Sequence, residues 1–165
     1  MTNTVDLTSI LDTLLIAGVD FVLVGALAAV AQGAPVTTHD VDIVHARTPE
    51  NIDRLVGALA ALNAHYRGRP SNSRLPPSPE ALATIGHSLF STDLGPLDCL
   101  GAIEDGMTFD DLQGHSVALD FQGRTLRVLR LETIVANKRR SPHNKDKLML
   151  PVLEQTLQQS RALRP

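Results

Sequence analysis

The fold is decided by residues 21–44, which read FVLVGALAAVAQGAPVTTHDVDIV. The opening run FVLV predicts a buried strand, and Gly25 follows where the chain has to turn into a short helix over residues 26–32. A second strand is then predicted to carry Asp40 and Asp42. Because successive side chains of a strand alternate between its faces, both carboxylates are expected on the same face. Like charges this close shift each other's pKa unless a cation lies between them, so the pair predicts a divalent-metal site.

Gly25 adds a second chemical feature to the same stretch. Glycine lets the backbone come close to a ligand, and the free N–H groups at a helix start attract anions such as phosphate. A phosphate-binding turn and a carboxylate pair therefore occur within one strand–helix–strand unit. This combination indicates metal-assisted nucleotide chemistry.

The unit resembles the nucleotidyltransferase superfamily related to DNA polymerase β, which is marked by hG[GS], a spacer and Dh[DE]h, where h is apolar. Val24, Gly25 and Ala26 correspond to the first element, and residues 40–43 (DVDI) correspond to the second. Ala26 departs from the pattern, because it stands where the family has Gly or Ser. The resemblance implies a nucleotidyltransferase fold of the α/β (α+β) class, with a mixed central β-sheet flanked by helices and with C-terminal helices.

The resemblance also implies a third carboxylate from a later strand, and two aspartates compete for that role. Asp98 lies in GPLDCLG as the odd polar residue of an apolar strand, and Asp120 lies in VALDFQG. Thr92, Gly95 and Asp98 resemble the T-x-x-G-x-hD segment of small bacterial nucleotidyltransferase-like proteins. Asp98 is therefore favoured, and Asp120 stays open as the alternative.

Residues 131–165 predict a C-terminal helical segment of two helices, separated by a Ser-Pro step. The sequence LETIVANKRRSPHNKDK resembles the closing segment of the same small proteins. This likeness implies that Lys138 reaches the triphosphate and that Lys145 or Asp146 braces the site. Positive side chains at the C-terminal end of a helix interact favourably with its dipole, and this explains Lys138 and the two arginines after it nearly as well.

The expected roles of the site residues follow from the resemblance. Asp40, Asp42 and Asp98 are the expected catalytic and metal-binding residues, with Mg²⁺ or Mn²⁺ as the cofactor. The expected nucleotide-binding residues are Gly25, Ala26, Thr38, Lys138 and Lys145.

Composition and charge fit one domain spanning residues 1–165, with 43% hydrophobic residues and a net charge of −3. Residues 1–120 contain 5 of the 15 Lys and Arg and 15 of the 18 Asp and Glu, whereas residues 121–165 contain the other 10 and 3. An acidic catalytic part with a basic tail suits a metal site that faces a polyphosphate or RNA. Mutual attraction of the two parts during folding, or a partner subunit over the tail, would explain the asymmetry equally well.

The predicted loop over residues 63–79 is rich in arginine and proline and is expected near the site. It is interpreted either as a lid that closes on substrate or as a plain solvated loop. The chain has no apolar run long enough for a membrane span and no signal-peptide pattern, and Cys99 is its single cysteine. These features predict a cytoplasmic protein.

The function implied by the resemblance is transfer of an NMP from an NTP to a hydroxyl group on tRNA, a protein or a small molecule. Several small members of the superfamily belong to toxin–antitoxin systems, so a toxin or antitoxin partner is a further expectation. The departure at Ala26 leaves an alternative. In that case the chain is a catalytically degenerate module of the same fold, which acts by binding a nucleotide or a protein partner.

Overall fold

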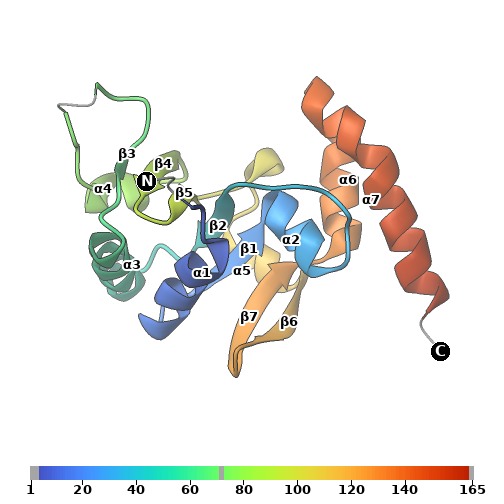
Figure 1. Cartoon of the computed structure of the whole chain (residues 1–165), viewed down its shortest axis with the longest axis horizontal. Coiled ribbons are helices and arrows are strands. Elements are labelled where there is room, and N and C mark those ends of the chain that lie inside the picture. Colours follow the sequence, from blue (N-terminus) through green and yellow to red (C-terminus); the bar gives the residue numbers. More distant parts are fainter. Residues whose placement is uncertain (1–3, 71–72, 164–165) are drawn as a thin grey trace.

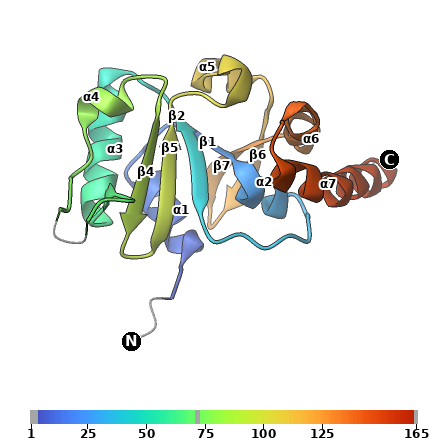
Figure 2. The same cartoon turned by 90° about the horizontal axis from the view of Figure 1, so that it is seen from above.

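The computed structural model describes residues 4–70 and 73–163, and within them seven strands form one mixed sheet in the order β3-β4-β5-β2-β1-β7-β6. Its strands are β1 (Phe21–Val24), β2 (Val41–His45), β3 (His65–Tyr66), β4 (His87–Thr92), β5 (Gly95–Leu100), β6 (Ser116–Phe121) and β7 (Arg124–Leu129). The helices are α1 (Leu7–Ile16), α2 (Gly25–Ala31), α3 (Pro49–Ala61), α4 (Pro79–Leu82), α5 (Phe109–Gln113), α6 (Leu131–Arg140) and α7 (Asn144–Ala162). In both views α3 and α4 lie at one end of the molecule and α6 and α7 at the other (Figures 1 and 2).

The centre of the sheet is the apolar core of the molecule. All four residues of β1 are buried, and Val41 and Ile43 of β2 are fully buried, as their alternation with the aspartates predicts. β1 pairs antiparallel with β2, with Val24 opposite Asp42. β2 pairs parallel with β5, and this register sets Asp42 opposite Asp98. Two carboxylates from distant parts of the sequence therefore lie on neighbouring strands.

The two longer N-terminal helices, α1 and α3, each begin at a side-chain cap. The carboxylate of Asp6 accepts a hydrogen bond of 3.0 Å from the backbone N–H of Ser9 at the start of α1. The hydroxyl of Thr48 accepts one from the backbone N–H of Asn51, and Pro49 follows as the first residue of α3. These contacts satisfy N–H groups that have no partner within the helix.

The side chain of Gln32 joins α2 to the start of α6. The amide of Gln32 donates a hydrogen bond of 2.8 Å to the carbonyl of Leu129, and its oxygen accepts one of 3.0 Å from the N–H of Leu131. Gln32 is the residue that ends α2, and Leu131 is the first residue of α6. The helix after Gly25 and the helix that carries Lys138 are thus held in a fixed relation.

The structure corrects two local predictions. The predicted loop over residues 63–79 contains the short strand β3, because Tyr66 packs on Phe90 with ring centroids 4.8 Å apart and its N–H bonds to the carbonyl of Leu75. Residues 71–72 of that loop lie outside the described residues. Asp40 precedes β2, which begins at Val41, so only one of the paired aspartates lies on the strand.

The mixed sheet with flanking helices and the two C-terminal helices are as predicted. None of the helices in residues 4–70 and 73–163 has the length and apolar character needed to cross a membrane.

Candidate active site

Three carboxylates come together near the start of β2, one of them from the neighbouring strand β5. Asp40, Asp42 and Asp98 each offer one oxygen, and these oxygens all lie within 4.8 Å of one another. The sheet register brings Asp42 and Asp98 together, and the hydroxyl of Thr38 contacts a carboxylate oxygen of Asp40 at 3.2 Å. The competing Asp120 is exposed on β6 at the edge of the sheet, opposite Thr125, and does not belong to the cluster.

The electrostatics of the cluster favour a cation. Burial and the negative charges of Asp40 and Asp98 together raise the pKa of Asp42 to about 7, against the opposing charge of Lys138. The cluster therefore carries more negative charge than its surroundings compensate. Carboxylate oxygens are hard ligands of the kind that Mg²⁺ and Mn²⁺ prefer, so the donor set fits such an ion.

Gly25 is required by the position of Asp42. Its φ is +73°, a conformation that residues with a Cβ rarely adopt. A Cβ added at Gly25 would overlap a carboxylate oxygen of Asp42 and would lie 3.2 Å from the Cγ of the same side chain. Glycine at this point therefore permits both the turn into α2 and the inward position of the carboxylate.

Lys138 faces the carboxylates from α6. Its ammonium donates a hydrogen bond of 2.6 Å to Oδ1 of Asp146, and the hydroxyl of Ser141 donates one of 2.6 Å to Oδ2. Burial acts to raise the pKa of Asp146, but these two hydrogen bonds together with the positive charge of Lys138 hold the pKa below its ordinary value. Asp146 thus stays ionised and orients Lys138, while Lys145 is exposed at the start of α7.

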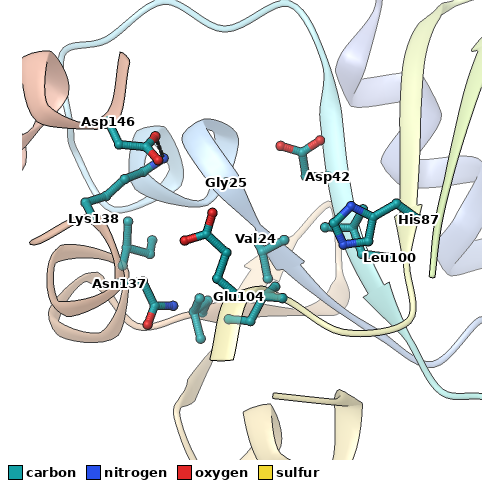
Figure 3. A pocket seen from close by; sticks show the side chains of 12 residues that line it. Val24, Gly25, Asp42, His87, Leu100, Glu104, Asn137, Lys138 and Asp146 are labelled. Carbon is teal, nitrogen blue, oxygen red and sulfur yellow. Dashed lines mark hydrogen bonds and ion pairs between the residues drawn. The ribbon is translucent and has the colours of Figure 1, made fainter. Parts of the chain in front are cut away.

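Two adjoining cavities share Gly25, Asp42, Lys138 and Asp146. The first, of about 250 Å³, has apolar walls and is also lined by Val24, Leu100, Leu129 and Ile134, with Glu104, Asn137 and His87 as polar groups. In Figure 3, Lys138 and Asp146 reach in from the C-terminal helices, and Asp42 and His87 lie on the side of the sheet. The second cavity, of about 340 Å³, is more polar than the first and is called the polar cavity below; it is also lined by Ala26, Thr38, Asp40, Arg67 and Lys145. Every residue expected to bind metal or nucleotide lines one of the two cavities, except Asp98.

Arg67 is a site residue that the sequence did not single out. Its guanidinium donates a hydrogen bond of 2.8 Å to Oδ1 of Asp98 and one of 3.0 Å to the carbonyl of Phe90. Asp98, which lines neither cavity, is joined to the polar one through this ion pair. The arginine-rich composition of residues 63–79 was a signal, but only the pairing of β3 with β4 specifies which arginine reaches the site.

Comparison with known proteins yields structural matches only, because no protein-family model and no curated sequence matches the chain. The lincosamide antibiotic adenylyltransferase LnuA, bound to lincomycin, matches with a TM-score of 0.59 at 13% identity, over 92% of this chain and 98% of that one. ANT(2'')-Ia in complex with adenylyl-2''-tobramycin matches with a TM-score of 0.57 at 16% identity, over 95% and 94%. A candidate nucleotidyltransferase from Thermotoga maritima, TM1012, matches with a TM-score of 0.51 at 22% identity, over 95% and 89%. The chain has the nucleotidyltransferase fold.

The predicted fold class is thereby confirmed, including the mixed sheet and the helices around it. Identities of this size carry the nucleotidyltransferase fold and nothing finer, because one fold serves many chemistries. What the chain does has to be argued from the cluster of Asp40, Asp42 and Asp98 and from the cavities beside it.

Proposed function

We propose that the chain is a metal-dependent nucleotidyltransferase, which moves an NMP from an NTP to a hydroxyl group of an acceptor. One observation carries this proposal: three carboxylate oxygens lie within 4.8 Å of one another, and one of them belongs to Asp42, beside the Gly25 turn. A divalent cation fits a cluster of this kind, and the adjoining cavities offer room for a nucleotide. The antibiotic adenylyltransferases of the same fold make the reaction class plausible on independent grounds.

Asp40, Asp42 and Asp98 would hold Mg²⁺ or Mn²⁺. When bound, such an ion neutralises phosphate charge and lowers the pKa of a hydroxyl that is to attack. In the reaction a bond forms between the acceptor oxygen and the α-phosphorus, the bond from that phosphorus to pyrophosphate breaks, and the hydroxyl proton is lost. Thr38 would hold the carboxylate of Asp40 in place through their contact of 3.2 Å.

The cationic side chains assign two sides to the site. The charge of Lys138 acts on Asp42, so we propose that the nucleotide phosphates lie on that side, with Lys138 as their counter-ion. Gly25 and Ala26 let the backbone come close to the phosphates, and Lys145 adds charge at the entrance. Asp98 instead faces Arg67, and we propose that the acceptor hydroxyl approaches from there.

Replacement of both Asp40 and Asp42 by Asn tests the proposal. The variant keeps the shape of the two side chains and removes their charge, so it should not bind Mn²⁺. It should also transfer no label from radioactive NTP to acceptors in a cell extract. Asp120→Asn is the matched control, because this carboxylate lies outside the cluster. Transfer that persists in the double variant would refute the proposed chemistry.

Ala26 supports the degenerate binding module as a second candidate, because it lines the polar cavity without the hydroxyl or the bare backbone that Ser or Gly would offer there. Nucleotide or partner binding that is unchanged by a chelator would favour this module. Protein, tRNA and small-molecule acceptors, and a toxin–antitoxin partner, are distinguished by identifying the labelled product. A cytoplasmic location is proposed as well, and the buried, unpaired Cys99 fits it.

A further inference from the structure

A third cavity, of about 190 Å³, lies beside the candidate active site and is lined by three arginines. We call it the arginine pocket. Its polar lining consists mainly of His65, Arg67, Arg69, Ser73, Arg74 and Ser91. No Asp or Glu is among the described residues that line it.

The charge of the arginine pocket stands out against its surroundings. Residues 1–120 contain no lysine and only five arginines, Arg47, Arg54, Arg67, Arg69 and Arg74, and the last three line this one pocket. Within residues 4–70 and 73–163, Arg69 and Arg74 form no ion pair, whereas Arg54 pairs with Asp20. Two guanidinium groups thus remain available for an anion.

The arginine pocket opens next to the carboxylate cluster. Arg67 lines both this pocket and the polar cavity, and it donates to Asp98. The backbone holds this arrangement, because the N–H of Arg67 bonds to the carbonyl of Leu89 and the N–H of Tyr66 bonds to the carbonyl of Leu75. An anion in the pocket would therefore be separated from Asp98 only by the guanidinium of Arg67.

From these contacts we infer that the arginine pocket binds a phosphate group of the acceptor. Guanidinium groups match phosphate oxygens in geometry and charge, and the hydroxyls of Ser73 and Ser91 add neutral donors. Apart from Arg67, none of the described residues that line the pocket lines either cavity beside Lys138, and so the pocket is separate from the space assigned to the nucleotide. The acceptor class is accordingly a phosphate-bearing molecule, such as an RNA end or a sugar phosphate. The identification of this ligand as the acceptor rests on the proposed function, whereas the binding of a phosphate group in the pocket does not.

The test is binding without NTP or metal, in a chelating buffer and with the full chain. A fluorescent, short single-stranded RNA with a free 3′ hydroxyl is titrated by anisotropy, and ribose 5-phosphate is used as the competitor. The pocket variant is Arg69→Gln with Arg74→Gln, and the matched control is Arg47→Gln with Arg54→Gln, which removes equal charge elsewhere. Arg67 is left intact because it contacts Asp98.

The pocket variant is expected to bind the RNA at least about tenfold more weakly than the natural chain, since each charge-assisted hydrogen bond contributes about that factor. The control is expected to change the affinity by less than about twofold, as exposed charges do. Competition by ribose 5-phosphate would identify a small phosphate as sufficient, and its failure would point to RNA. Equal weakening in both variants, or no binding of either probe, would overturn the inference.

The same variants separate this inference from the proposed function. The pocket variant should still bind NTP with Mn²⁺, because Arg69 and Arg74 line neither cavity of the nucleotide side. Transfer to a phosphate-bearing acceptor at an unchanged rate in the pocket variant would leave the transferase standing and refute the pocket. Absence of NTP binding in the natural chain, with RNA binding present, would refute the transferase and leave the pocket standing.

Discussion

Gly25→Ala should destabilise the protein for two reasons that can be measured apart. At a φ of +73°, alanine is disfavoured by roughly 1–2 kcal/mol relative to glycine. The added Cβ would also overlap the Asp42 carboxylate, and forcing an extra carbon into a packed site costs roughly 1–3 kcal/mol more. The sum is about 2–5 kcal/mol, which for a chain of this size lowers the Tm by about 5–15 °C.

Two other glycines supply the controls. Gly123 has a φ of +81° and open space around it, so Gly123→Ala should show the conformational cost alone. Gly114 has neither a positive φ nor a neighbour within 4 Å, so Gly114→Ala should not destabilise the protein. Thermal unfolding followed by circular dichroism gives all three values. Asp42→Ala in the Gly25→Ala background should recover most of the steric part, as a double-mutant cycle.

A Gly25→Ala variant that lost no more stability than Gly123→Ala would refute the predicted overlap with Asp42. That result would mean that the turn and the carboxylate do not constrain each other. Unchanged stability together with unchanged Mn²⁺ affinity would remove the physical explanation offered for Gly25.

Three more predictions concern the charges of the site. The pKa of Asp42 is raised from 3.8 to about 7 in the native state, so between these pH values the metal-free native state binds a proton that the unfolded state has lost. The contribution of this group to stability should therefore be greatest below pH 3.8 and should fall as the pH rises to about 7. Urea unfolding of the natural chain and of Asp42→Asn at several pH values would compare how steeply the free energy of unfolding falls with pH. Lys138→Met removes the ion pair with Asp146, so it should lower the free energy of unfolding by roughly 1–3 kcal/mol and weaken NTP binding. Arg139→Met is the control, because Arg139 is in an exposed ion pair and its loss should change either property little. Urea unfolding and NTP titration measure the two properties. Arg67→Met should tighten Mn²⁺ binding in the absence of nucleotide by about threefold to tenfold, because it removes a positive charge bound to Asp98, and weaker binding in calorimetry would contradict this.

Much of the fold could be predicted because local signals agreed with the tertiary structure. The caps at Asp6 and Thr48 and the buried pair Val41 and Ile43 all follow from side-chain chemistry or periodicity. The choice of Asp98 for the cluster was open to prediction too, since a charged residue in an apolar strand needs a reason to be there.

Other features depend on contacts that periodicity does not encode. The strand β3 has two residues, too few for any alternation to appear, and it is held by Phe90 and by neighbouring carbonyls. The placement of Arg67 against Asp98 follows from that strand. The helix α5 did carry a signal, a capping box between Thr108 and Asp111, in a segment whose apolar residues show no clear period.

The parallel register of β2 and β5 has a consequence for insertions and deletions. Asp98 faces the cluster only because it stands opposite Asp42, and its neighbour Leu97 is fully buried. Loss or gain of one residue within β5 would exchange the two, so that the carboxylate entered the core and leucine replaced it in the site. Length variation among relatives of this chain should therefore accumulate in the connections, such as residues 33–39 and 67–78, and stop at the borders of these two strands.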